Sequence, residues 1–150
     1  MLLSRSEVLF ISDLHLSQTK PEITQQFLAF IKTRAVEARV LYILGDLFEV
    51  WVGDDNETPE FDELFQALKD YSAFTPIYYL HGNRDFLIGE ELAQRIGATL
   101  LPDPSVIQLD KLNIGLTHGD LLCSDDAEYM AFRKMVRSEE WQQDFLQKPL

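Results

Sequence analysis

The sequence predicts an α/β domain with a mainly parallel β-sheet that is covered on both faces. Strand-like apolar runs and amphipathic helical patterns alternate along the chain, and the connections between them are short. The strand-like runs are continuously apolar, which is typical of strands buried on both sides of a parallel sheet. No internal repeat, low-complexity segment or linker interrupts the pattern, so we expect a single domain over residues 1–150.

The first half of the chain contains three predicted strands and two predicted helices. Residues 7–12 (EVLFIS), 40–44 (VLYIL) and 76–80 (PIYYL) have the continuous apolar character of buried strands. The first helix begins at Pro21, since proline is favoured in the first turn of a helix. The second helix follows Thr58, which we expect to cap its N-terminus.

The second half contains a short helix, a pair of strands and two further helical segments. The short helix covers 89–96 and ends where a glycine follows it. Residues 105–110 and 112–117 are predicted to pair with each other through a turn. The helical pattern then resumes over 126–137 and 139–147.

Composition and charge exclude several classes of protein. The formal net charge is −12, and no basic patch offsets it, which argues against a nucleic-acid binder. An anionic substrate remains compatible with this charge, because a bound divalent cation can reverse the local field.

Cys123 is the only cysteine, so an intramolecular disulfide is impossible and a reducing compartment is expected. With no signal-peptide pattern and no run of ~20 apolar residues, we expect a cytoplasmic protein.

Polar clusters follow four of the predicted strands. Asp13 and His15 follow the first, Asp46 the second, Asn83 the third, and His118 the strand at 112–117. Because ligands bind at the carboxyl ends of strands in α/β sheets, we expect all four clusters at one edge of the sheet. Each cluster alone has an ordinary alternative as a turn or a structural residue. Together they suit Mn²⁺, Zn²⁺ or Fe²⁺ better than Ca²⁺, and they are numerous enough for two ions that share Asp46.

Four short motifs resemble a known family. The segments DLH (13–15), GDLFE (45–49), GNRD (82–85) and HGD (118–120) are similar to four of the five signature blocks of the calcineurin-like metallophosphoesterases. The resemblance extends over nearly the whole chain. It implies an α/β sandwich with a largely parallel inner sheet and a centre with two divalent metal ions, Mn²⁺ being the expected metal.

The resemblance also implies a role for each motif residue. Asp13 and His15 would bind the first ion, Asp46 would bridge both ions, and Asn83 and His118 would bind the second. Asp46, Asn83 and His118, with the arginine that follows Asn83, would form the catalytic set.

The sequences around these motifs resemble one branch of the family, which acts in the lipid A pathway. This resemblance implies hydrolysis of the pyrophosphate bond of a UDP-linked diacylglucosamine, in which metal-activated water attacks the α-phosphorus. The products would be UMP and the lipid sugar 1-phosphate. Such a substrate implies peripheral contact with the cytoplasmic face of the inner membrane, and neither a nucleic acid nor an obligate protein partner is expected. The alternatives are another phosphoesterase of the family and a non-catalytic binding remnant of the fold.

Arg84 and Asp126 are the further substrate-binding candidates beside Asn83. A guanidinium at position 84 can neutralise phosphate charge, but it cannot act as a general acid at neutral pH. Its alternative role is a structural ion pair with Asp85 or Glu49. Asp126 matches a substrate-contacting position of the family, and its alternative role is to cap the helix that follows it.

One family block has no counterpart in this sequence. The fifth block, Gly-His-x-His, supplies one ligand to each ion, and no histidine follows His118. The helical cap of the family would begin near residue 126 and would be incomplete. We therefore expect the N-terminal part of a metallophosphoesterase domain whose C-terminal part is missing and whose own activity is weak or absent.

Overall fold

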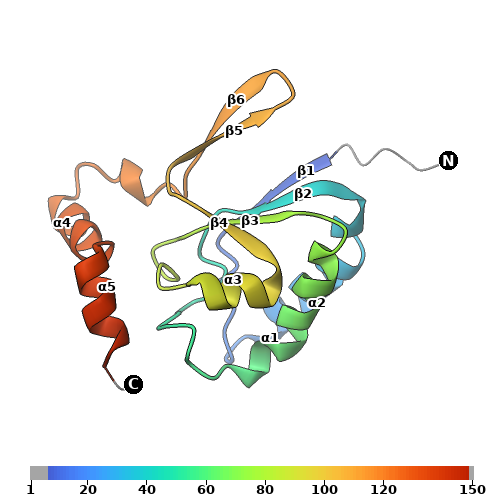
Figure 1. Cartoon of the computed structure of the whole chain (residues 1–150), viewed down its shortest axis with the longest axis horizontal. Helices are drawn as coiled ribbons and strands as arrows, with labels where there is room; N and C mark the ends of the chain where they lie inside the picture. Colours follow the sequence, from blue (N-terminus) through green and yellow to red (C-terminus); the bar gives the residue numbers. More distant parts are fainter. Residues whose placement is uncertain (1–6, 149–150) are drawn as a thin grey trace.

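A computed structural model of the chain describes residues 7–148, and its centre is a parallel sheet of four strands in the order β1-β2-β3-β4 (Figure 1). The strands are β1 (Glu7–Ile11), β2 (Ala38–Ile43), β3 (Ile77–Leu80) and β4 (Ala98–Leu101). The first three confirm the predicted strands. The sequence prediction missed β4, because this short strand directly follows the glycine that ends the preceding helix.

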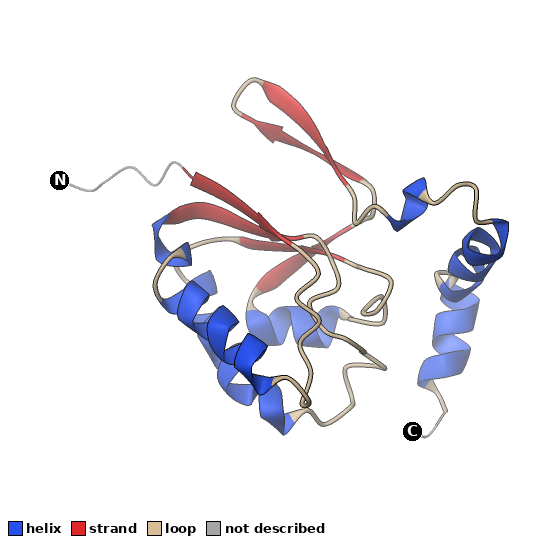
Figure 2. Ribbon diagram, turned by 180° about the vertical axis from the view of Figure 1, so that it is seen from behind, coloured by secondary structure: helices blue, strands red, loops and turns tan. Residues whose placement is uncertain are grey.

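Helices cover one face of this sheet (Figures 1 and 2). They are α1 (Pro21–Lys32), α2 (Asp62–Ser72) and α3 (Glu90–Ile96). Neighbouring strands place Leu41, Ile43 and Ile77 on the helix side, where they belong to the main hydrophobic core. The three predicted helices of this part of the chain are therefore confirmed.

The opposite face of the sheet lies against an antiparallel hairpin of β5 (Ser105–Leu109) and β6 (Leu112–Leu116). The predicted pairing of these strands is confirmed. They form a separate two-stranded sheet, however, so the expectation that the strand before His118 belongs to the parallel sheet is wrong. Leu116 packs with Tyr42 in a second, smaller core, while Phe10 on β1 stays 41% exposed. This face is therefore only partly covered.

Two C-terminal helices, α4 (Ala127–Val136) and α5 (Glu139–Leu146), lie beyond the carboxyl ends of the parallel strands (Figure 1). The Asp126 carboxylate accepts a hydrogen bond from the Tyr129 backbone nitrogen at 2.9 Å, so Asp126 does cap α4. None of the helices over residues 7–148 combines the length and the apolar character that crossing a bilayer requires.

A side chain far away in sequence fixes the start of α3. The Asp54 carboxylate accepts hydrogen bonds from the backbone nitrogens of Gly89 and Leu92 at 3.0 and 2.9 Å, and from the Trp51 indole at 3.0 Å. Thr58 was expected to provide a cap for α2, but its side chain makes no capping hydrogen bond. A 3₁₀ turn, Pro59–Phe61, precedes α2 instead and separates Thr58 from the first turn of that helix.

Candidate metal centre

The loops after β1 and β2 run side by side, held by backbone hydrogen bonds. The Asp13 nitrogen donates to the Gly45 carbonyl and the His15 nitrogen to the Asp46 carbonyl, each at 3.1 Å. These bonds extend the contact between β1 and β2 beyond the ends of the strands. They bring three of the predicted ligands, Asp13, His15 and Asp46, to one edge of the sheet.

These three residues share an unusual backbone conformation. The φ angles of Asp13, His15 and Asp46 are +57°, +49° and +52°, in the left-handed region that non-glycine residues rarely adopt. Such conformations gather at functional sites, where the surrounding structure fixes them.

Two glycines allow the loop after β3 to approach the same place. A Cβ atom added at Gly82 would lie 2.0 Å from Asp46 Oδ1, and one added at Gly45 would lie 2.4 Å from the Gly82 nitrogen. Only residues without a side chain permit this spacing. The close approach places Asn83, which follows Gly82, beside Asp46.

Asp13, His15 and Asp46 form a compact group of potential metal ligands. One ligand atom from each lies within 4.8 Å of the others. His15 Nε2 is 3.9 Å from Asp13 Oδ1 and 3.8 Å from Asp46 Oδ2. Two ligand atoms that each lie about 2.1 Å from a shared ion are at most about 4.2 Å apart. Both distances from His15 Nε2 are therefore short enough for a shared divalent cation.

His118 and Asn83 also meet beside Asp46. His118 Nδ1 lies 2.8 Å from the Leu44 carbonyl oxygen, which can only accept, so in the neutral ring Nδ1 carries the proton. Nε2 then presents a lone pair, and it faces the Asn83 Oδ1 acceptor at 3.0 Å and Asp46 Oδ2 at 3.7 Å. A cation is the partner that these atoms have in common, so they too fit a metal ion.

The two carboxylate oxygens of Asp46 have different surroundings. Oδ1 accepts a hydrogen bond from the Arg84 backbone nitrogen at 2.8 Å, whereas Oδ2 faces both the His15 and the His118 imidazoles. Burial raises the pKa of Asp46 above its ordinary value, against the opposing effects of the Arg84 amide and His118. A cation beside Oδ2 would favour the ionised carboxylate.

Arg84 lies at the rim of this centre and pairs with Glu49. Arg84 Nη1 is 3.5 Å from Glu49 Oε1, and the other oxygen of Glu49 is 3.0 Å from His15 Nδ1. Although that second distance is short, His15 Nδ1 has no aligned hydrogen-bond partner among the described residues. Two ion-pair partners were expected for Arg84, namely Asp85 and Glu49. Among the described residues, Arg84 pairs with Glu49 and not with Asp85.

Asp85 has a different role, which the sequence reasoning missed. Its side chain is buried and accepts hydrogen bonds from the Leu47 and Gly82 nitrogens, each at 2.8 Å, and from the Tyr79 hydroxyl. It therefore ties the loop that holds Asp46 to the loop that holds Asn83. The GNRD motif was the available signal, but a carboxylate after an arginine suggested an ion pair rather than a buried acceptor.

Two cavities adjoin the centre between the ligand loops and the C-terminal helices. The first, of about 210 Å³, is lined by Asn83, Arg84, Phe86, Asp120, Tyr129, Phe132, Arg133, Val136 and Arg137. The second, of about 400 Å³, is lined by Asn83, His118, Gly119, Asp120, Cys123, Asp126 and Tyr129. Asp126 thus caps α4 and also lines a cavity beside the metal-ligand candidates, so its two expected roles are compatible.

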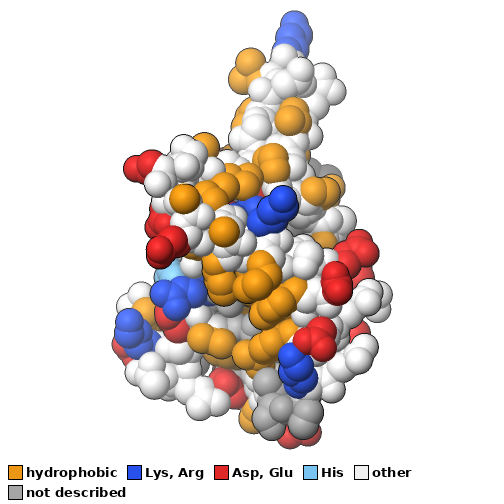
Figure 3. Space-filling view, turned by 90° about the vertical axis from the view of Figure 1, so that its left-hand side faces the viewer, with side chains coloured by type: hydrophobic (Ala, Val, Ile, Leu, Met, Phe, Trp, Pro, Cys, Tyr) orange, Lys and Arg blue, Asp and Glu red, His pale blue; other side chains and the backbone are white. Residues whose placement is uncertain are grey.

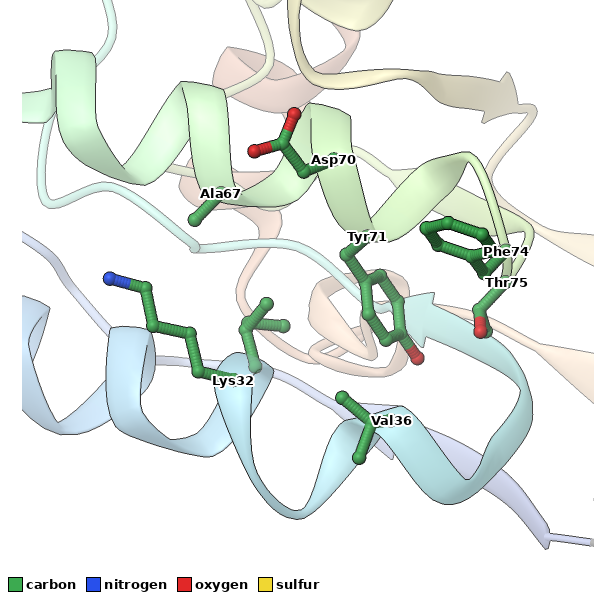
Figure 4. Close-up of a pocket in the computed structure, with 8 residues that line it drawn as sticks. Lys32, Val36, Ala67, Asp70, Tyr71, Phe74 and Thr75 are labelled. Carbon is green, nitrogen blue, oxygen red and sulfur yellow. The ribbon is translucent and has the colours of Figure 1, made fainter.

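A third cavity lies elsewhere, between the C-terminal parts of α1 and α2 (Figure 4). It also measures about 210 Å³, and its lining includes Val36, Ala67, Tyr71 and Phe74. None of the predicted site residues lines it. The concentration of carboxylate, amide and imidazole groups therefore favours the sheet edge as the functional site.

Comparison with known proteins agrees with this fold. The profile of the calcineurin-like phosphoesterases matches residues 6–149. The chain belongs to the calcineurin-like phosphoesterase family.

Within this family, the chain is similar to several curated proteins that carry the same name. The chain is 51% identical over 143 residues to the UDP-2,3-diacylglucosamine hydrolase of Stenotrophomonas maltophilia (strain K279a), and it covers 58% of that protein. It is 49% identical to the enzymes of the same name from Sodalis glossinidius and Chromobacterium violaceum, covering 60% of each. The alignments include 95%, 95% and 94% of this chain, respectively. The chain spans about three fifths of the length of these relatives. Among solved structures, the Pseudomonas putida nuclease MPE matches with a TM-score of 0.47 and 16% identity, over 66% of this chain and 49% of the nuclease.

Proposed function

We propose that the chain is the metal-binding part of a hydrolase that cleaves the pyrophosphate bond of UDP-2,3-diacylglucosamine. The products would be UMP and 2,3-diacylglucosamine 1-phosphate, a step of lipid A biosynthesis. The observation that carries the proposal is the position of Asp46 Oδ2, which faces His15 Nε2 at 3.8 Å and His118 Nε2 at 3.7 Å. Relatives that are about half identical and named for this reaction support the choice of substrate.

The centre would hold two divalent ions, with Mn²⁺ as the proposed metal. Asp13 and His15 would bind one ion, Asn83 and His118 the other, and Asp46 both. The mixture of imidazole nitrogens with carboxylate and amide oxygens suits Mn²⁺ better than an all-oxygen ion such as Ca²⁺. When bound, such ions supply Lewis-acid polarisation of phosphate oxygens and lower the pKa of a nearby water.

Arg84 and Asp126 would hold the substrate beside these ligands. Arg84 is about half exposed at the edge of the smaller cavity, so its guanidinium can reach a bound phosphate once it leaves Glu49. It stays protonated at neutral pH and would therefore act by neutralising charge, not by donating a proton to the leaving group. Asp126 and Asn83 both line the larger cavity, where Asp126 could accept a hydrogen bond from the substrate.

A lipid substrate would bring the protein to the cytoplasmic face of the inner membrane. Figure 3 views the molecule from the side of α4 and α5 and shows hydrophobic side chains gathered there. Phe132 and Met135 of α4 and Leu122, which precedes that helix in the chain, are 52%, 50% and 76% exposed. Exposed apolar groups of this kind favour peripheral contact with acyl chains.

The test is UMP release from UDP-2,3-diacylglucosamine with Mn²⁺, using the product of the complete open reading frame that encodes this chain. Wild type should turn over the lipid, and Asp46→Asn should lower the rate by at least about 100-fold, since Asp46 serves both proposed ions. Asp55→Asn, which changes an exposed acid later in the same loop, is the matched control. Metal binding with turnover of a nitrophenyl phosphodiester but not of the lipid would overturn the substrate assignment alone.

A further inference from the structure

Arg133 of α4 connects this helix to the loop of His118. Arg133 Nε donates to Asp120 Oδ2 at 2.8 Å, and Arg133 Nη2 donates to Asp103 Oδ2 at 3.0 Å. The other oxygen of Asp103 accepts a hydrogen bond from the His118 backbone nitrogen at 3.2 Å. One guanidinium therefore holds two carboxylates near His118. Asp103 binds the backbone nitrogen of His118, and Asp120 lies two residues after His118 in the chain.

Arg137, at the end of the same helix, connects it to the loop of Asn83. Arg137 Nη2 donates to the carbonyl oxygen of Gly82 at 2.7 Å, and its guanidinium lies over the Phe86 ring at 5.3 Å. Gly82 directly precedes Asn83. The contact therefore fixes the peptide from which the Asn83 side chain reaches His118.

The network is buried and balanced in charge. The Asp103 and Asp120 side chains are 3% and 6% exposed, and those of Arg133 and Arg137 are 13% and 18% exposed. Two carboxylates face two guanidinium groups, so the cluster has no excess charge with which to bind an anion. Buried ion pairs with this geometry fix the relative positions of the segments that they join.

Among the described residues, no hydrogen bond or ion pair joins Asp13 or His15 to α4. Asp13 and His15 are held by backbone hydrogen bonds to Gly45 and Asp46 within the loops of the parallel sheet. Apart from the shared Asp46, the ligands thus divide into a pair held by the loops of the sheet and a pair that is also held from α4.

We propose that Arg133 and Arg137 are positioning residues for His118 and Asn83, so that α4 determines the affinity of one metal position and not of the other. This inference rests on the two-ion assignment made under the proposed function. Groups that orient metal ligands without touching the ion typically change metal affinity by about 10–100-fold when they are removed.

The test is titration of the metal-free product of the complete open reading frame with Mn²⁺, followed by calorimetry and electron paramagnetic resonance. Arg137→Gln and Arg133→Lys should weaken one Mn²⁺ site by about 10–100-fold and leave the other unchanged. They should also reduce the signal of spin-coupled Mn²⁺ pairs at a fixed metal concentration. Lys134→Gln removes one charge from an exposed position of the same helix and should behave as wild type.

The outcomes separate this inference from the proposed function. The inference alone would be overturned if both Mn²⁺ sites kept their wild-type affinity in both arginine variants. It would also be overturned if the two sites lost affinity to the same extent. A wild-type protein that binds a single Mn²⁺ would overturn the two-ion assignment and the inference with it. Circular dichroism of each variant establishes that it is folded, and if Arg133→Lys is not, the Arg137→Gln titration decides.

Discussion

The carboxylate of Asp85 accepts a hydrogen bond from the backbone nitrogen of Leu47 at 2.8 Å, across two loops that are distant in sequence. The same side chain also binds the Gly82 nitrogen and the Tyr79 hydroxyl. Burial and the adjacent Asp85 carboxylate raise the pKa of Tyr79 well above its ordinary value, so its hydroxyl remains a donor. One buried carboxylate therefore organises the backbone around Asp46 and Asn83.

Asp85→Ala should lower the free energy of unfolding by about 3 kcal/mol or more. The substitution leaves three buried donors without an acceptor, and each such group costs about 1–3 kcal/mol. Urea unfolding followed by circular dichroism measures the change. Asp144→Ala, which removes an exposed carboxylate paired with Lys148, should cost about 0.5 kcal/mol or less. Equal effects of the two substitutions would contradict the role given to Asp85.

Gly82→Ala should abolish tight Mn²⁺ binding, because the new methyl group would lie 2.0 Å from Asp46 Oδ1 and displace that carboxylate. Gly115→Ala is a matched control, since a Cβ atom at that position would have no atom within 4 Å other than those of its own chain neighbours. Calorimetric titration with Mn²⁺ compares the two variants. Wild-type affinity in Gly82→Ala would show that the close approach of the two loops is unnecessary for the site.

Asp54→Ala should destabilise the protein by about 1–2 kcal/mol or slightly more. It removes the acceptor for the first turn of α3, and loss of a helix cap typically has this magnitude. The Trp51 indole would lose its partner as well, so tryptophan fluorescence should change in the folded state. Asp55→Ala at the exposed neighbouring position should stay within about 0.5 kcal/mol of wild type. If Asp54→Ala and Asp55→Ala were equally stable, the capping role given to the Asp54 carboxylate would be contradicted.

Stability at high pH should depend on Tyr129. Burial and the hydrogen bond to Asp120 raise the pKa of the Tyr129 phenol to about 12. Because the folded-state pKa lies above the unfolded value of about 10, this contribution is complete below pH ~10 and is lost as the pH rises toward ~12. Tyr129→Phe should therefore show a weaker loss of stability over this range than wild type. Parallel curves of unfolding free energy against pH would contradict the assignment.

Periodicity and continuous apolar runs were sufficient for the helices and for the first three strands. They failed where an element has little local signal, as for β4, which begins directly after Gly97. They predicted β5, β6 and their pairing, but not that these strands form a separate sheet, because an apolar run does not reveal which sheet it joins. His118 nevertheless reaches the centre, since the β5–β6 hairpin ends beside the loop that follows β2.

The candidate ligands were accessible from sequence because short motifs carry them, whereas their supports were not. Asp103 and Arg133 lie 30 residues apart and contact each other only after folding. Asp85 stands inside a motif, but its burial depends on two other loops. Contacts between distant segments are decided by packing, which no local pattern encodes.

The positive φ angles of Asp13, His15 and Asp46 set stability and chemistry against each other. A left-handed conformation costs a non-glycine residue about 1–2 kcal/mol, whereas glycine adopts it freely. Asp13→Gly should therefore leave the metal-free chain at least as stable as wild type while it removes a ligand. At these positions the most stable sequence and the metal-binding sequence differ, so selection for stability alone would erase the site.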